Sequence, residues 1–249
     1  MALDVYVGPL AHYYAGAGYR IALADAAADH LKPKDPERIH ATILTWRRAL
    51  SDFLGDNIPA PLDWDETPAA PRFTGRPGWD GWAALVLWAA YAEHPLLRRP
   101  DTLSDEWEND AALARSNAEG FRSRYSHLVR HVELWLPSPF PFTFDGKDVD
   151  GHRVVLGSAP TLQRQLADLN GATWKAGDDV VAGWGRRPPS DGASLELRAR
   201  YGFAAMVKAV QQAIDHRLPM KLDYGREPAR NAGALRAVDT ADQGGEIRP

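Results

Sequence analysis

The sequence predicts an α+β fold, and three patterns lead to that class. Residues 82–91 are apolar on every side, which predicts a central helix that is packed all round. Residues 194–216 carry apolar side chains at helical spacing and predict a long amphipathic C-terminal helix. Short β-like runs at 3–7 and 220–224, together with hairpin turns elsewhere, predict an antiparallel sheet. This mixed order of elements favours one α+β domain over residues 1–225.

The first half of the chain predicts helices that alternate with loops. After the first strand, residues 19–30 predict a short Ala-rich helix, and apolar spacings of three and four predict another over 39–54. Residues 56–77 are rich in proline and acids and predict an irregular loop. The central helix is expected to span 78–94 and to end at Pro95.

The second half predicts helices around a group of hairpins. Residues 104–119 predict a polar helix that a serine caps and a glycine ends. Residues 158–170 predict a capped helix with leucines on one face. Residues 183–192 predict a loop. Residues 226–249 have no periodicity and predict a disordered tail. Turn residues separate three further strand-like runs, which are 128–136, 140–144 and 152–156.

Composition narrows the function classes. The chain has 249 residues, a net charge of −4 and no cysteine, which excludes disulfides, thiolate metal sites and cysteine nucleophiles. Its charges form no basic block, so we expect no nucleic-acid partner. The longest apolar run, 82–91, is about half the length that a bilayer requires, so we expect no membrane partner. These features favour a cytoplasmic protein and leave its oligomeric state open.

No motif predicts a metal or a cofactor. His127 and His131 would share a face if they lay on a helix, but in a strand they would lie about 13 Å apart. We interpret them as solvated or capping histidines. The run 145–151 lacks the bidentate acid of a calcium loop and predicts a hairpin turn. The glycines of 16–21 follow no strand directly and do not complete a dinucleotide fingerprint.

Several carboxylates lie beside aromatic residues at the edges of predicted elements. A cluster of such acids could perform acid–base hydrolysis, because burial separates their pKa values. The alternative is structural: Asp80 would complement a helix dipole, and Asp4 and Asp223 would pair with arginines or accept from backbone amides. A separation above about 10 Å would exclude one catalytic pair. The candidates are Asp4, Asp80, Glu133 and Asp223, with Tyr6, Tyr13 or Tyr14 nearby.

The two ends of the domain resemble each other. The first strand-like run holds Asp4 two residues before Tyr6, and the last holds Asp223 directly before Tyr224. Because these spacings differ, the side chains cannot occupy equivalent faces of a strand. We therefore predict that both runs are strands of one sheet that encloses the domain from its two ends.

Two acidic segments that contain tryptophan predict a protein-binding surface. Exposed aromatic side chains anchor interfaces, and carboxylates steer a basic partner. We expect the contact surface to comprise residues 56–77 and 101–110, which leads to the hypothesis of an immunity partner that neutralises a secreted toxin. The alternative is that these rings belong to the core. The candidate contact residues are Asp63, Trp64, Asp65, Glu66, Glu106 and Trp107.

Several segments resemble a group of bacterial proteins for which no activity is established. They occur in order from the start of the domain to its end, so the resemblance implies a shared architecture and assigns no catalytic residue. His127 and His131 fall outside them. The segments read LDVYVGPLAHYYAG, PGWDGWAALVLWAAY, ELWLP and RLPMKLDY.

Overall fold

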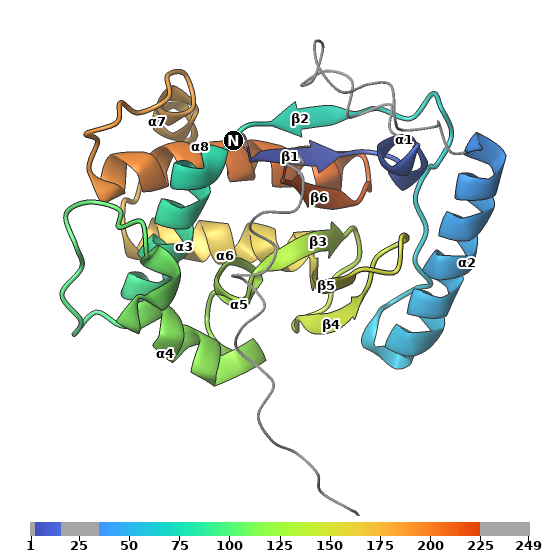
Figure 1. The fold of residues 1–249 in the computed structure, drawn as a ribbon, viewed down its shortest axis with the longest axis horizontal. Helices are drawn as coiled ribbons and strands as arrows, with labels where there is room; N and C mark the ends of the chain where they lie inside the picture. Colours follow the sequence, from blue (N-terminus) through green and yellow to red (C-terminus); the bar gives the residue numbers. More distant parts are fainter. Residues whose placement is uncertain (1–2, 16–34, 225–249) are drawn as a thin grey trace, which may run out of the picture.

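The computed structural model describes residues 3–15 and 35–224, which form a single α+β domain (Figure 1). Helices pack around a six-stranded sheet whose strand order is β2-β1-β6-β3-β5-β4. The α+β class that the sequence predicts is therefore confirmed. The helix expected at 19–30 and the tail expected at 226–249 lie outside the described residues.

The sheet is mixed, which corrects the expectation of an antiparallel sheet. Only β3 and β5 run parallel. After β3 the chain forms the outer strand β4 and then returns between β3 and β4 as β5, which therefore has the same direction as β3. The sequence shows hairpin turns but not which strands they bring together. The strands are β1 (Asp4–Val7), β2 (Phe73–Gly75), β3 (Val132–Leu136), β4 (Phe144–Lys147), β5 (Arg153–Ser158) and β6 (Met220–Asp223).

The two ends of the domain meet inside this sheet. β1 pairs with β6 in antiparallel fashion, and Asp4 lies directly opposite Asp223. The prediction that both runs belong to one sheet is confirmed. The two strands are neighbours in its interior and leave the edges to β2 and β4.

The described residues contain eight α-helices and several 3-10 turns. The α-helices are α1 (Leu10–Tyr14), α2 (Pro36–Leu54), α3 (Gly78–Glu93), α4 (Ala111–Glu119), α5 (Ser126–Val129), α6 (Ala159–Ala172), α7 (Asp178–Trp184) and α8 (Leu195–Asp215). The 3-10 turns are Gly55–Asn57, Trp107–Asn109 and Gly120–Arg122.

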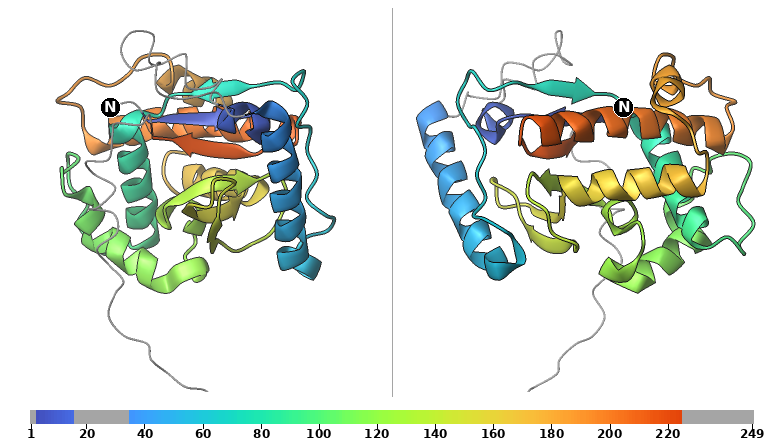
Figure 2. Two further views of the ribbon diagram at one scale, coloured as in Figure 1. Left: turned by 45° about the vertical axis from the view of Figure 1, so that its right-hand side comes forward. Right: turned by 180° about the vertical axis from the view of Figure 1, so that it is seen from behind.

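The central helix is α3, which is buried from Gly81 to Tyr91 as its sequence predicts. It packs against α8 at a pair of glycines. A β-carbon at Gly202 would overlap the carbonyl oxygen of Gly81, so this crossing requires glycine. From behind, α8 and α6 cover one face of the sheet, and α2 stands apart at its edge (Figure 2). α1 follows the end of β1 and packs against α2.

Tertiary contacts shift four predicted elements. The strand expected over 140–144 lies at Phe144–Lys147 instead, because these residues pair with β5, and the hairpin turn expected over 145–151 is correspondingly shorter. The predicted helix over 104–119 begins only at Ala111, because Asp110 caps it and accepts from the Ala112 amide at 2.8 Å. The strand expected over 128–136 is shorter, because its first residues form α5. The loop expected over 56–77 contains β2, which pairs with β1.

Candidate functional site

An extended segment beside α2 is the most distinctive surface feature of the described chain. We call residues 59–69 the acidic strap. Its side chains alternate: Leu62, Trp64 and Glu66 are buried, while Asp63 and Asp65 face solvent. This period of two is that of a strand with one face on the core. The alternation is visible in the sequence, and it separates the predicted contact residues into two groups.

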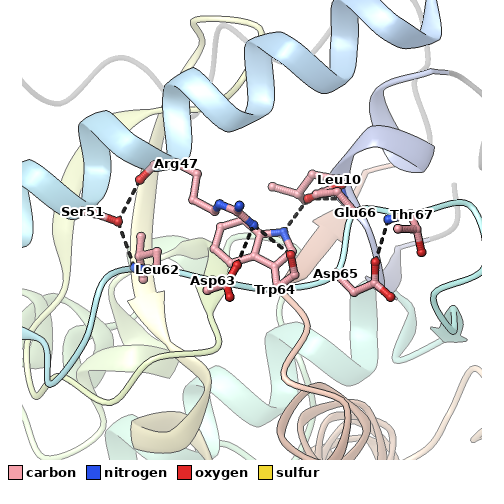
Figure 3. Close-up of polar contacts among 9 residues, drawn as sticks. All are labelled: Leu10, Arg47, Ser51, Leu62, Asp63, Trp64, Asp65, Glu66 and Thr67. Atoms are coloured by element: carbon pink, nitrogen blue, oxygen red, sulfur yellow. Dashed lines mark hydrogen bonds and ion pairs between the residues drawn. The ribbon is translucent and has the colours of Figure 1, made fainter.

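Two polar side chains of α2 fix the strap (Figure 3). Ser51 accepts a hydrogen bond from the Leu62 amide at 2.9 Å. Arg47 donates to the Trp64 carbonyl oxygen at 2.8 Å, and its guanidinium lies 5.1 Å from the centre of the Trp64 ring. The same guanidinium lies 3.5 Å from the Asp63 carboxylate, whose side chain is 80% exposed. These contacts anchor the strap to α2.

Glu66 fastens the strap to α1. Its Oε1 accepts from the Leu10 amide at 3.1 Å and from the Trp64 indole, and its Oε2 accepts from the Ala11 amide at 2.8 Å. Burial raises the pKa of Glu66, while the three donors and the positive charge of Arg47 lower it. Trp64 and Glu66 were predicted as contact residues. The structure places both inside the protein, where they organise α1.

A groove of about 830 Å³ lies between α2 and the start of the strap. Its lining includes Leu44, which is 36% exposed, and Pro61 of the strap. Arg48 lines the groove in the middle of α2, and Asp52 and Asp56 line it near the C-terminal end. None of the four predicted catalytic carboxylates lines this groove.

The second predicted contact segment, 101–110, lies beside α3 and α4, at the opposite end of the molecule from α2 (Figure 1). Trp107 is half-buried, and the centre of its ring lies 6.4 Å from that of His131. Glu106 is exposed, and its amide donates to the Ser104 hydroxyl. The two predicted contact segments therefore form two separate surfaces.

Two of the four predicted catalytic carboxylates, Asp4 and Asp223, lie directly opposite each other in the sheet. Asp4 is held by two hydrogen bonds from Arg76, at 2.8 and 3.1 Å, and it faces Asp223 across the strand pair. Asp80, at the start of α3, forms an ion pair with Arg198 of α8. Glu133 lies in β3, the strand that pairs with β6, and its charge acts on Tyr224, which follows β6.

Three tyrosines accompany this pair. Tyr13 donates to Asp223 at 3.4 Å, and the centre of its ring lies 5.3 Å from that of Tyr6 and 5.1 Å from that of Tyr14. Of the two carboxylates, Asp223 contacts a tyrosine, whereas Asp4 contacts Arg76.

A buried tie that the sequence interpretation did not include lies next to these rings. Asp148 accepts from the Tyr14 hydroxyl at 3.1 Å and lies 3.6 Å from the ammonium of Lys221, which is itself buried. Burial and the charge of Asp148 raise the pKa of Tyr14.

His127 is fully buried and His131 is half-buried, so the interpretation of these histidines as solvated is wrong for His127. Burial, with the nearby charge of Arg164, lowers the pKa of His127 to about 3, and its amide donates to Gln165 at 2.9 Å. Burial also lowers the pKa of His131, which adopts a positive φ of 53° between α5 and β3. Within residues 3–15 and 35–224, no group of three or more acids or histidines is arranged to hold a metal ion.

A comparison of the chain with protein families, curated proteins and solved structures finds no match. Among the described helices, none combines the length and the apolar character needed to cross a membrane. The function must therefore be argued from the geometry of the chain itself.

Proposed function

We propose that this protein acts by binding another protein that presents a basic surface, as an immunity protein binds a secreted toxin in the cytoplasm. The observation that supports this proposal is the acidic strap. Its exposed carboxylates, Asp63 and Asp65, are carried on a backbone that Arg47, Ser51 and Glu66 already fix. A surface ordered before association loses less conformational entropy when it binds.

Charge and shape around the strap support the same proposal. Asp52 and Asp56 line the neighbouring groove, and both are exposed. Together with Asp63 and Asp65 they give this end of the molecule an excess of negative charge, despite Arg47 and Arg48. Carboxylates arranged in this way steer a basic partner and raise its association rate. The apolar part of the groove, at Leu44, offers a place for an anchoring side chain.

The segment 101–110 is not part of this proposed surface, because it lies at the far end of the molecule. It provides a matched control, since it also carries exposed acids beside a tryptophan. The resemblance to a group of bacterial proteins stays a prediction and adds no activity to the proposal.

Co-expression with the product of the neighbouring gene, followed by affinity purification, tests the proposal. We expect a complex whose dissociation constant rises with salt concentration. The double variant Asp63→Lys/Asp65→Lys should weaken it at least tenfold, whereas Asp105→Lys/Glu106→Lys should leave it within twofold. No complex and no rescue from toxicity would refute the proposal. Equal effects of the two double variants would refute the assignment to the strap.

Hydrolysis is the second candidate function, and one observation favours it. Asp4 and Asp223 lie opposite each other beside Tyr6, Tyr13 and Tyr14. Both carboxylates already have partners, in Arg76 and Tyr13, which favours the structural interpretation. Screening with p-nitrophenyl esters, phosphates and glycosides tests the activity. Hydrolysis that Asp223→Asn abolishes without loss of fold would establish this alternative.

A further inference from the structure

We propose that α2 is a self-association surface, through which two copies of the chain pair with their α2 helices antiparallel about a two-fold axis near Thr45. The inference concerns the outward side of α2 and does not rest on the binding of a foreign protein. It is carried by the arrangement of apolar, small and charged side chains along this one helix.

The first step is that α2 packs on the domain through one side only. Its buried residues recur at spacings of four and seven, which keeps them on a single face. The opposite face is exposed, and α2 forms the rim of the described domain at one end, where a second copy can approach (Figure 1). We call this exposed face the outer face of α2, and it comprises Arg38, Ala41, Thr42, Thr45, Ala49 and Asp52.

The second step is that the middle of the outer face is suited to burial. Ala41, Thr45 and Ala49 are small and lie in successive turns, so another backbone can approach closely. The hydroxyls of Thr42 and Thr45 donate to the Arg38 and Ala41 carbonyl oxygens at 2.8 and 3.0 Å. These hydroxyls therefore need no partner outside the helix, and the threonine methyl groups remain for contact. A shallow hollow of about 420 Å³ lies at this place.

The third step is that a large apolar side chain flanks the outer face. Phe53 is 67% exposed and follows Ala49 by four residues, so the two lie on the same side of the helix. The centre of the Phe53 ring lies 5.4 Å from that of Phe144 in the edge strand β4, which supports the ring. A ring supported in this way loses little conformational freedom when a partner covers it, and it is the expected anchor of the contact.

The charges of the outer face select a second copy in antiparallel orientation. Arg38 lies near the N-terminal end of α2 and Asp52 near its C-terminal end, equally far from Thr45 along the helix. An antiparallel pair centred on Thr45 therefore brings Arg38 of each copy beside Asp52 of the other, and it sets opposite ends of the helix dipoles together. A parallel pair would bring like charges together. The antiparallel contact is self-complementary, as a two-fold dimer requires.

The strap and its groove lie on another flank of α2. Arg47 and Ser51, which bind the strap, are not part of the outer face. The two surfaces share Asp52, which also lines the groove. The proposed dimer thus carries two straps, with Asp63 and Asp65 of each still facing solvent.

The length of α2 sets the expected strength of the dimer. A helix of 19 residues is about 28 Å long, so a contact between two such helices is smaller than the interface of a permanent dimer. We therefore expect a reversible dimer with a dissociation constant in the micromolar range. The paired charges should make this constant rise with salt concentration.

Sedimentation equilibrium of the full chain, from micromolar to millimolar concentrations, tests the proposal. Arg38→Glu, which opposes like charges, and Phe53→Ser, which removes the anchor, should each raise the dissociation constant about tenfold. The double variant Arg38→Glu/Asp52→Arg exchanges the two charges and should restore wild-type association. Asp63→Lys/Asp65→Lys, which alters the strap alone, should leave the dimer unchanged. Circular dichroism verifies that each variant is folded.

Three outcomes of this experiment would overturn the proposal. A chain that stays monomeric at every concentration excludes the dimer. A dimer that neither Arg38→Glu nor Phe53→Ser weakens lies on another surface. Failure of the charge exchange to restore association excludes the pairing of Arg38 with Asp52.

Cross-linking tests the orientation, because the chain contains no cysteine and an introduced one is unique. With a short bismaleimide, Thr45→Cys should form a covalent dimer faster than Leu197→Cys, whose position in α8 is 53% exposed. A mixture of Ala41→Cys and Ala49→Cys should react faster than either variant alone, since an antiparallel pair sets these positions side by side. Equal rates in either comparison would contradict the antiparallel contact.

Discussion

The two acidic, tryptophan-containing segments have similar compositions but different structures. In the strap, Trp64 is 5% exposed and its indole donates to Glu66. In 101–110, Trp107 is half-buried against His131, and Glu106 points into solvent. The difference is one of periodicity. The strap alternates apolar and acidic residues and lies flat on the core, whereas 101–110 curls into a turn before α4. Composition alone does not distinguish an interface from a core element.

The largest difference between the segments should appear when each tryptophan is removed. Trp64→Ala leaves a cavity beside α1 and should lower the free energy of unfolding by about 3–5 kcal/mol. Trp107→Ala removes a half-buried ring and should cost about 1 kcal/mol. Urea unfolding of both variants measures the contrast. Equal losses would mean that the two rings are packed alike.

Replacing Glu66 or Glu106 with alanine should give a smaller difference in the free energy of unfolding. Glu66→Ala leaves the Leu10 and Ala11 amides and the Trp64 indole without their acceptor, which should cost about 1–3 kcal/mol. Glu106→Ala changes an exposed side chain and should stay within about 0.5 kcal/mol. The same denaturation experiment measures both. A Glu66→Ala variant as stable as the wild type would show that the strap contributes nothing to α1.

The pH dependence of stability should also separate these two residues. Because the pKa of Glu66 is raised in the folded protein, its contribution is complete below its unfolded value and is lost as the pH rises through the folded value. Glu66→Gln should therefore become more stable relative to the wild type between pH 4 and neutrality, by about 1.4 kcal/mol per unit of pKa shift. Urea unfolding across this range measures it. Glu106→Gln should show no such trend.

The smallest effect should come from the side chain that joins α2 to the strap. Arg47→Lys keeps the charge but loses the planar group over Trp64 and the bond to its carbonyl oxygen, which should cost about 0.5–1 kcal/mol. Arg48→Lys, one residue further on and exposed, should leave stability unchanged in thermal unfolding. If Arg47→Lys and Arg48→Lys changed stability equally, Arg47 would not be an anchor of the strap.

Much of the fold could be predicted from the sequence, because long periodic segments carry their own signal. The uniform apolar run of α3 and the stripe of α8 are examples. The start of α4 was missed because Ser104 and Asp110 are both good caps. Asp110 is the residue that caps α4, because its carboxylate is also held by a hydrogen bond from the Tyr91 hydroxyl of α3 at 2.8 Å. β2 was missed because three residues are too short for an alternation to show.

The candidate site was predictable only in part. The acids and tryptophans of the strap could be identified, but whether each side chain faces solvent depends on the core beneath it. Glu66 is buried because it meets amides that lie 56 and 55 residues away in sequence. The tie between Asp148 and Lys221 is likewise set by the arrangement of the sheet, and spacing along the chain does not show it.

The pairing of β1 with β6 has a consequence for how the chain is made. A ribosome releases Asp4 more than two hundred residues before its partner Asp223. During that interval β1 can pair with β2, but its other edge remains without the strand that covers it in the native sheet. Unpaired strand edges are templates for association with other chains. We therefore expect nascent chains that stop before β6 to depend on chaperones, and completion of the sheet to be a late event in biosynthesis.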